Sequence, residues 1–181
     1  IARWSKQWQE SDGEPIPDGA ITAVKMGTTV ATNALLERKG ERVALLITEG
    51  FGDLLRIGTQ ARPALFDLNI RRPDLLYERV FEIPGRLDAE GVEVRPLDAA
   101  AVALALAQAR AEGIVAVAVA LMHGHVNPAH EAQVGILARE AGFTQVSLSH
   151  QVSRLAKLVP RGDTTAVDAY LSPILRRYVE Q

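Results

Sequence analysis

Two hydroxyl groups follow a glycine in the segment Gly27-Thr28-Thr29, and Asn33 comes one helical turn later. A glycine lets the backbone approach a ligand, while threonine hydroxyls and a carboxamide can donate hydrogen bonds to an oxyanion or an amide. A helix that begins here would add its unpaired N–H groups to the same site. The alternative is that Thr28 or Thr29 only caps the helix and Asn33 faces solvent.

A similar combination recurs near the end of the chain, where Arg161-Gly162-Asp163-Thr164-Thr165 joins a guanidinium, a glycine and two hydroxyls. We expect the last helix to begin at Gly162, which would place Arg161 and Thr164 at its start as candidate ligands for a phosphate or a substrate. Plain capping of this helix by Asp163 is the alternative.

His123, His125 and His130 lie close together with Glu131, which is a set of side chains that could bind a metal ion. The spacing differs from the two-histidine helix pattern of zinc proteases, because Val134 stands where the second histidine would be. We therefore predict no metal site and expect these histidines to be structural or to orient a substrate. His123 is kept as a candidate binding residue.

Arg62, Asp67, Arg71 and Arg72 belong to a charged stretch with little periodicity, residues 59–73. Such a segment predicts a loop that could close over a charged ligand. A solvated loop with ordinary surface charge is the alternative. Arg62 is the candidate ligand-binding residue of this loop.

These candidate residues need elements to position them, and the hydrophobic pattern predicts strands that alternate with helices. The expected strands cover residues 21–26, 42–48, 76–84, 114–121 and 143–149. The expected helices cover residues 30–39, 50–58, 98–112, 128–141 and 162–181. Stops are expected at Gly40, Gly113 and Gly142, caps at Asp98 and Asn127, and a kink or restart at Ser172-Pro173.

The order of these elements predicts an α/β fold with a mostly parallel sheet, built from β-α-β units with helices on both faces. The run at 114–121 is the most apolar in the chain and should lie in the middle of the sheet. In such sheets ligands gather at the carboxyl ends of the strands, where the candidate turns are expected.

Composition excludes several functional classes. Twenty basic and 22 acidic residues give a formal charge of −2, so nucleic acid and membrane surfaces are not expected partners. Without cysteine the chain has no disulfide or thiolate chemistry, and a cytoplasmic location is expected. Neither a Walker-type loop nor a dinucleotide-binding glycine fingerprint is present.

The domain organisation is expected to be simple. Residues 1–20 are turn-rich and proline-punctuated and predict a lead-in segment, while residues 21–181 predict one α/β domain. The sequence begins with Ile1 rather than methionine. We interpret the chain as an incomplete, internal part of a larger enzyme.

Several motifs together resemble the hydantoinase A and 5-oxoprolinase family, and the resemblance covers about residues 20 to 180. They are Met26 to Gly40, Gly50-Phe51-Gly52-Asp53-Leu54-Leu55, Ile57 to Pro63, Leu121-Met122-His123, Asn127 to Glu131 and Val159 to Pro173. Gly58-Thr59-Gln60-Ala61-Arg62 and Val159-Pro160-Arg161-Gly162 are more similar to the 5-oxoprolinase branch than to the hydantoinase or acetone carboxylase branches.

The resemblance implies a fragment of an actin or sugar-kinase-like ATPase region. It also implies an ATP-dependent hydrolase that opens the lactam of 5-oxoproline to glutamate, with Mg²⁺ and, in many members, K⁺. By motif match it carries a binding role over to Gly27, Thr28, Thr29, Asn33, Arg62, His123 and Arg161. No catalytic residue is assigned. At Gly124-His125 many relatives have Ser-Tyr, so His125 is not counted as a family residue.

The phosphate-binding segment with which the family opens would lie before residue 1, so the chain alone is expected to be inactive and to hold no tightly bound cofactor. The expected partners are the remaining domains or a subunit of the same enzyme, a small cyclic amide, and further copies in a homo-oligomer. Three alternatives stay open: an N-methylhydantoinase or other cyclic-amide hydrolase, a related ATP-dependent carboxylase subunit, and a non-catalytic scaffold module.

Overall fold

A computed structural model describes residues 27–59 and 74–180 of the chain. A four-stranded sheet with strand order β2-β1-β5-β6 forms the centre, and all of its neighbouring strands are parallel. Its strands are β1 (Val43–Thr48), β2 (Arg79–Ile83), β5 (Ala116–Ala120) and β6 (Gln145–Leu148). The predicted mostly parallel α/β fold is therefore confirmed, and the 114–121 run lies mid-sheet as expected.

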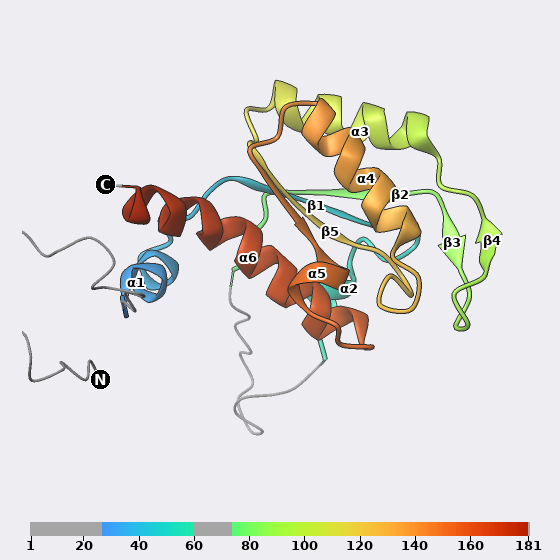
Figure 1. Cartoon of the computed structure of the whole chain (residues 1–181), viewed down its shortest axis with the longest axis horizontal. Helices are drawn as coiled ribbons and strands as arrows, with labels where there is room; N and C mark the ends of the chain where they lie inside the picture. The colour runs from blue at the N-terminus through green and yellow to red at the C-terminus, as the bar shows by residue number, and fades with distance from the viewer. Residues whose placement is uncertain (1–26, 60–73, 181) are drawn as a thin grey trace, which may run out of the picture.

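Helices cover both faces of this sheet (Figure 1). The helices α3 (Ala99–Ala111) and α4 (Ala129–Glu140) lie on one face, and the long helix α6 (Leu158–Val179) crosses the other. The short helices are α1 (Val30–Leu36), α2 (Leu54–Ile57) and α5 (Ser149–Val152). A two-stranded antiparallel sheet of β3 (Arg86–Leu87) and β4 (Glu93–Arg95) projects beyond the end of α3.

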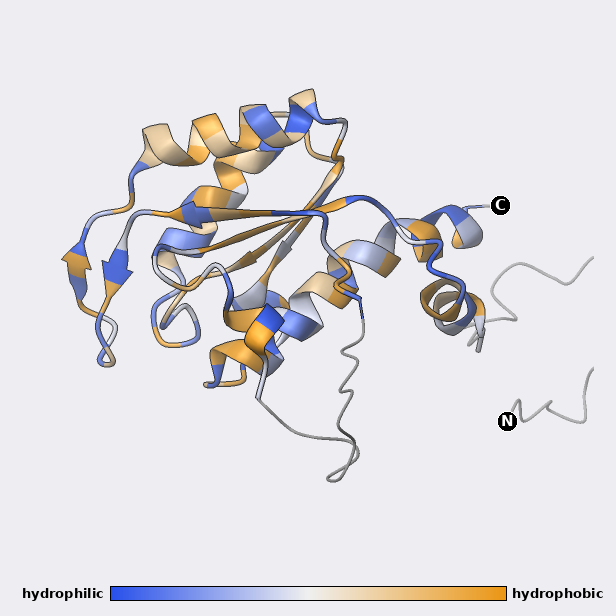
Figure 2. Ribbon diagram, turned by 180° about the vertical axis from the view of Figure 1, so that it is seen from behind, coloured by the Kyte–Doolittle hydropathy of each residue, from blue (hydrophilic) through white to orange (hydrophobic). Residues whose placement is uncertain are grey.

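Strand β5 shows why the two faces differ. Its valines, Val117 and Val119, belong to the core under α3 and α4, whereas Ala116, Ala118 and Ala120 face α6. Side chains alternate along a strand, so one face of β5 is bulky and the other is small. The small face of β5 lets α6 lie close to the sheet. Figure 2 shows the middle of the sheet mostly in the hydrophobic colours, between the helices.

The predicted ends of α3 and α4 agree with the structure to within one residue, and the residues that cap these helices explain the agreement. Asp98 accepts a hydrogen bond from the Ala101 N–H at 3.0 Å and so caps α3, while Gly113 and Gly142 adopt positive φ values after α3 and α4. At the start of α4 the N-cap is Pro128 rather than Asn127. The Asn127 side chain still accepts a hydrogen bond from the Ala129 N–H.

Helix α6 corrects the predicted start and excludes one of the two alternatives predicted at Pro173. It begins at Leu158 instead of Gly162, because Lys157 is the N-cap and Pro160 fits within the first turn, where a backbone N–H has no helical partner. It also continues through Pro173, so no restart occurs there. Arg161 and the residues after it are therefore inside the helix.

Helix α1 ends three residues earlier than predicted, and Gly40 does not cap it. Arg38 takes the left-handed conformation with φ of 55°, whereas Gly40 lies against the ring of Tyr170, 2.0 Å from where a Cβ would stand. The second helix is also shorter than predicted and covers only Leu54–Ile57. Sequence reasoning missed the β3–β4 hairpin and α5. The expected strand 21–26 and most of the loop 59–73 lie outside the described residues.

Candidate functional site at the carboxyl ends of the strands

Parallel pairing brings the ends of β1, β5 and β6 to the same edge of the sheet. The turn of residues 121–127 follows β5 at this edge, and α5 follows β6 directly. The first part of α6 reaches the same edge, because Arg161 donates a hydrogen bond to the Leu121 carbonyl. This edge is where open parallel sheets bind ligands.

The first two residues of the turn are held by side chains from three elements. The Leu121 N–H donates to Glu131 of α4 at 2.9 Å, and the Leu121 carbonyl accepts from Arg161 Nη2 at 2.6 Å. The Met122 N–H donates to the hydroxyl of Thr48, the last residue of β1, at 2.9 Å. The start of the turn is thereby fixed relative to the sheet and both helix layers.

Glu131 is fully buried, yet its carboxylate is fully hydrogen-bonded. Oε1 accepts from the Leu121 N–H and from the Ser149 hydroxyl at 2.5 Å. Oε2 accepts from the His150 N–H at 2.9 Å and contacts His150 Nδ1 at 2.6 Å. Such bonds offset the cost of burying a charge. They explain how Glu131, in the first turn of α4, can lie under the turn.

Arg161 is the second fully buried charge at this edge. Nη2 binds the Leu121 carbonyl, while Nε and Nη1 have no hydrogen-bond partner among the described residues. Burial lowers the pKa of Arg161, and the negative charge of Glu131 opposes this shift. The guanidinium still keeps its proton, since arginine is not deprotonated in proteins. It is therefore a buried cation with unused donors.

The two histidines of the turn lie next to each other, with ring centroids 6.3 Å apart. His123 has a φ of 59°, an uncommon backbone conformation for a residue other than glycine. His125 Nδ1 is buried without a partner among the described residues. Burial, followed by the charges of Arg161 and His123, lowers the pKa of His125, which keeps its ring neutral at pH 7.

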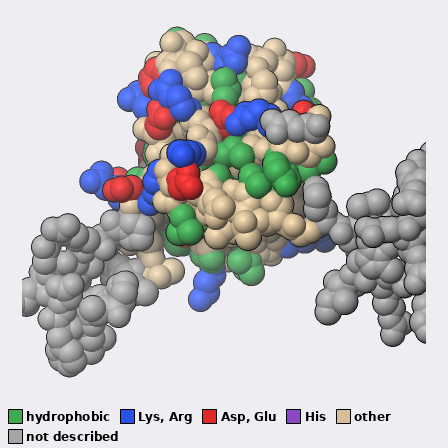
Figure 3. Space-filling view, turned by 90° about the vertical axis from the view of Figure 1, so that its left-hand side faces the viewer, with side chains coloured by type: hydrophobic (Ala, Val, Ile, Leu, Met, Phe, Trp, Pro, Cys, Tyr) green, Lys and Arg blue, Asp and Glu red, His purple; other side chains and the backbone are tan. Residues whose placement is uncertain are grey.

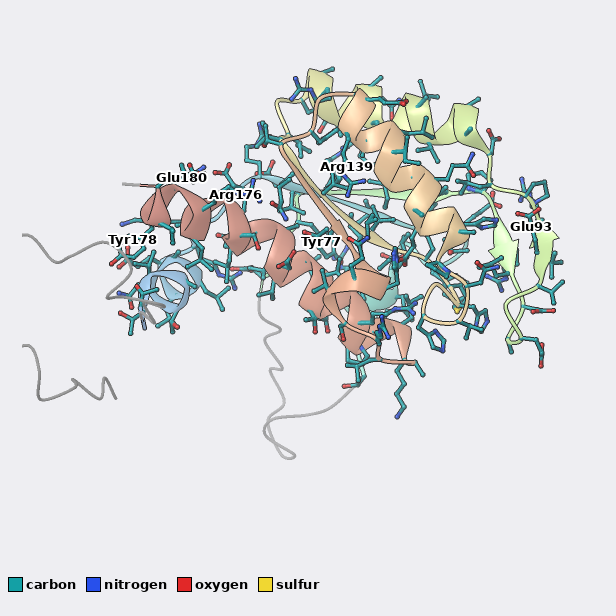
Figure 4. All side chains as sticks on the ribbon, viewed as in Figure 1. Tyr77, Glu93, Arg139, Arg176, Tyr178 and Glu180 are labelled. Atoms are coloured by element: carbon teal, nitrogen blue, oxygen red, sulfur yellow. The ribbon has the colours of Figure 1, made fainter. Side chains whose placement is uncertain are left out.

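The structure separates His130 from the other histidines. Its Nε2 contacts Glu93 of the β3–β4 hairpin at 2.7 Å, and the labelled Glu93 in Figure 4 lies at the outer end of the molecule. Among residues 27–59 and 74–180, no group of three or more His, Asp or Glu side chains is arranged to hold a metal ion.

Thr164 and Thr165 do not stand at a helix start as expected. Both hydroxyls donate to carbonyls one turn earlier in α6: Thr164 to Pro160 and Thr165 to Arg161, each at 2.7 Å. Thr164 is exposed and Thr165 is buried. The geometry thus brings Arg161 and His123 to one edge, with Thr164 on the adjoining turn of α6.

The first candidate group lies elsewhere. Gly27, Thr28, Thr29 and Asn33 are all exposed, and Thr28 Oγ1 accepts a hydrogen bond from the Val30 N–H at 3.2 Å. Helix α1 packs against α6, and Figure 1 places it beside the C-terminal end of that helix, far from α5. The described structure does not bring this group together with Arg161.

The connection between α1 and β1 explains this separation. The Glu41 N–H donates to the Tyr170 carbonyl at 3.0 Å, and Arg177 pairs with the Glu41 carboxylate. These contacts fix α1 at the amino ends of the strands. Tyr178 and Glu180 are labelled at this end in Figure 4, and Figure 3 shows charged side chains beside hydrophobic ones on the face nearest to it.

Arg62, Asp67, Arg71 and Arg72 lie outside the described residues, so their predicted loop has no structural account. Sequence reasoning missed three residues at the edge, namely Thr48, Ser149 and His150. The signal that could have found them was available, because each lies at or directly after the carboxyl end of a strand.

In the described residues, no helix is both long and apolar enough to cross a membrane.

Comparisons of the sequence and of the structure with known proteins point to the same family. The chain is 45% identical to 5-oxoprolinase 1 of Arabidopsis thaliana over 91% of its length, and it spans 14% of that relative. It matches the crystal structure of an ATP-dependent caprolactamase from Pseudomonas jessenii with a TM-score of 0.78 and 36% identity, covering 85% of this chain and 23% of that one.

A nucleotide-free acetone carboxylase structure matches in fold, with a TM-score of 0.72 at 22% identity, over 82% of this chain and 23% of the other. The family model for the hydantoinase/oxoprolinase N-terminal region matches residues 2–142. The chain therefore belongs to the hydantoinase/oxoprolinase family, of which it carries the N-terminal region.

Proposed function

We propose that this chain is part of an ATP-dependent hydrolase that opens a cyclic amide, with 5-oxoproline as the substrate. The observation that carries the proposal is the 45% identity to a 5-oxoprolinase across 91% of the chain. The fold match to a caprolactamase adds support, because caprolactam is also a cyclic amide and that enzyme is ATP-dependent. The chain spans only 14% of the 5-oxoprolinase, so the activity belongs to a longer protein.

The chemistry explains why ATP is required. Amide resonance makes a lactam carbonyl resistant to water, and ATP, when bound, would supply a phosphoryl group that activates the lactam oxygen. Residues of this chain would bind and orient the substrate. Arg161 fits an anionic ligand, since its buried Nε and Nη1 have no partner among the described residues.

The other proposed binding residues are Gly27, Thr28, Thr29, Asn33, Arg62, His123 and Thr164. Arg62 lies outside the described residues, and the other six fall into two groups, Gly27, Thr28, Thr29 and Asn33 near α1, and His123 and Thr164 near the carboxyl ends of the strands. A substrate and a nucleotide would use different groups. The described residues contain no cluster of three or more His, Asp or Glu side chains for a metal ion. Mg²⁺ would be held in part by the phosphates of the nucleotide, and both Mg²⁺ and K⁺ are proposed for the intact enzyme.

We also propose that the rest of the enzyme, or a second subunit, packs against this domain, that the enzyme is a homo-oligomer, and that it works in the cytoplasm. Neither nucleic acid nor a membrane is among the proposed partners. The exposed Leu36 and Val179 near α1 offer apolar surface for such contacts. The alternatives are an N-methylhydantoinase, an ATP-dependent carboxylase subunit and, for the chain by itself, a non-catalytic scaffold module.

The test is turnover by the intact enzyme with ATP and each of 5-oxoproline, N-methylhydantoin, caprolactam and acetone. We expect glutamate and ADP to form together with 5-oxoproline, with the highest kcat/KM among the four compounds. Hydrolysis of another lactam with no action on 5-oxoproline would contradict the substrate assignment. Carboxylation of acetone would place the enzyme in the carboxylase branch instead.

A further inference from the structure

His150 is the second residue after β6, so its side chain lies at the same edge of the sheet as the turn of residues 121–127. Its side chain is 17% exposed, in contrast to Glu131, whose side chain is 0% exposed. Its Nε2 makes no hydrogen bond with the other described residues. Nδ1 is therefore hydrogen-bonded to Glu131, and Nε2 can contact a substrate or a water molecule.

Glu131 sets which nitrogen carries the proton. Oε2 accepts the His150 backbone N–H and lies 2.6 Å from Nδ1, while Oε1 is occupied by Leu121 and Ser149. Because the Glu131 carboxylate accepts hydrogen bonds from all of these groups, it also accepts one from Nδ1–H of His150. The proton of the imidazole is then on Nδ1, and Nε2 carries the lone pair. The same backbone and side-chain bonds prevent Glu131 from turning away, since it is held at four points.

We propose that His150 Nε2 is the general base of the ring-opening reaction and that Glu131 is its positioning residue. This inference rests on the proposed function, because the base needs a cyclic amide to act on. A buried carboxylate that orients an imidazole through Nδ1 is a known way to build a proton acceptor. The dyad joins Glu131 of α4, which lies in one of the family-like motifs, to His150 of α5, which lies in none of them.

The proton balance of the reaction is simple. The oxygen of a water molecule forms a bond to the carbonyl carbon of the ring while one of its protons passes to Nε2. The ring C–N bond breaks, and the nitrogen takes up the proton that the imidazolium returns. If the lactam oxygen carries the phosphoryl group from ATP, the opened product would be an acyl phosphate, and a second water would hydrolyse it to the carboxylate and phosphate. His150 and Glu131 finish in their starting state.

The neighbouring charges are compatible with this role. Helix α5 packs against α6, β5 and β6, and neither strand carries a titratable side chain. The charged groups on the surrounding segments include Glu131 of α4, Arg154 and Lys157 between α5 and α6, and Arg161 and Asp163 in the first turns of α6. Asp168 of α6 accepts a hydrogen bond from Ser147 of β6, and the titratable residues of the turn are its two histidines. Protonation of His150 removes the base, so kcat is expected to fall as the pH is lowered.

The decisive variant is His150→Asn in the intact enzyme. The asparagine Nδ2 can take the place of Nδ1 and keep the hydrogen bond to Glu131, but the variant has no basic nitrogen. We expect kcat for 5-oxoproline to fall by about 100-fold or more, KM to change by less than threefold, and the fall of kcat at low pH to disappear.

His130→Gln is the matched control. His130 is another buried histidine paired with a glutamate, but it faces the β3–β4 hairpin rather than the edge. Glutamine can keep the contact of Nε2 with Glu93, and we expect kcat within about twofold of wild type. A purely structural role for His150 predicts that both variants behave alike.

His150→Ala provides a second, independent readout, in case the asparagine variant melts at a lower temperature than wild type. Added imidazole should restore its kcat at least tenfold, and no restoration would overturn the inference. If wild type opens 5-oxoproline and His150→Asn keeps kcat within threefold, the base assignment is wrong while the proposed function stands. If wild type opens no lactam, the proposed function fails and the assignment fails with it.

Discussion

At the scale of single residues, the edge of the sheet depends on hydrogen bonds that converge on one buried carboxylate. Ser149 supplies one of the two bonds to Glu131 Oε1. Ser149 is itself fully buried, so no water can replace its hydroxyl without rearrangement. The stability of this edge should therefore respond to the loss of a single hydroxyl group.

Replacing Ser149 by alanine should destabilise the protein by about 1–3 kcal/mol, because a hydrogen bond to a buried charge is lost. Urea denaturation measures the difference. Thr144→Ala is the control, since the exposed Thr144 hydroxyl only bonds the Val115 carbonyl at 3.3 Å, and its effect should stay within about 0.5 kcal/mol. Equal effects for the two variants would contradict the importance of the Glu131 network.

His125 should make the stability depend on pH. Burial lowers its pKa in the folded protein, so below the ordinary histidine pKa of about 6.5 the unfolded chain takes up a proton that the folded chain does not. Stability attributable to His125 is thus complete above pH 6.5 and is lost as the pH falls below it. Denaturation between pH 7.5 and 5 should show a smaller loss in His125→Gln than in wild type. Parallel curves would show that His125 titrates normally.

The residues at this edge were only partly predictable. The residue pattern and the motif resemblance both indicate His123 and Arg161, and the structure brings both to the turn that follows β5. Glu131 was considered only as a metal ligand, and the bonds that it makes to α5 depend on a contact between segments 18 and 19 residues apart. Hydrophobic patterns place elements, but they do not indicate which buried polar groups meet.

At the scale of elements, the strands followed the sequence more closely than the helices did. The runs that became β1 and β5 are buried throughout, and uninterrupted aliphatic residues predict this directly. The start of α6 was misplaced because glycine and threonine resemble a helix start, whereas packing of Gly162 against Leu55 explains that glycine. The β3–β4 hairpin was missed because its strands have only two and three residues.

Gly40→Ala tests the packing of α1 on α6. A Cβ at this position would stand 2.0 Å from the ring of the buried Tyr170, so either the ring or the chain must move. We expect a loss of about 1–3 kcal/mol in the free energy of unfolding.

Gly27→Ala is the matched control for that substitution. Nothing lies within 4 Å of a Cβ at Gly27, so the stability should be close to that of wild type. If Gly40→Ala were as stable as this control, α1 would not pack against Tyr170 in solution.

At the scale of the whole molecule, the chain spans about one seventh of the length of a related 5-oxoprolinase. We expect residues 1–181 alone to show no ATP hydrolysis and no release of glutamate from 5-oxoproline, whereas the intact enzyme shows both. Coupled ADP assays with equal molar amounts of the two proteins measure the difference. ATP turnover by the isolated chain would show that it contains a complete nucleotide site.

The parallel sheet also has a consequence for biosynthesis. Val43 of β1 pairs with Ala116 of β5, so one side of β1 has no partner until about 70 further residues have left the ribosome. At about 5–20 residues per second this takes roughly 4–15 s, during which a six-residue strand that is wholly buried in the folded protein stays open on that side. The nascent chain is therefore expected to need shielding by a chaperone at Val43–Thr48 until β5 has been translated.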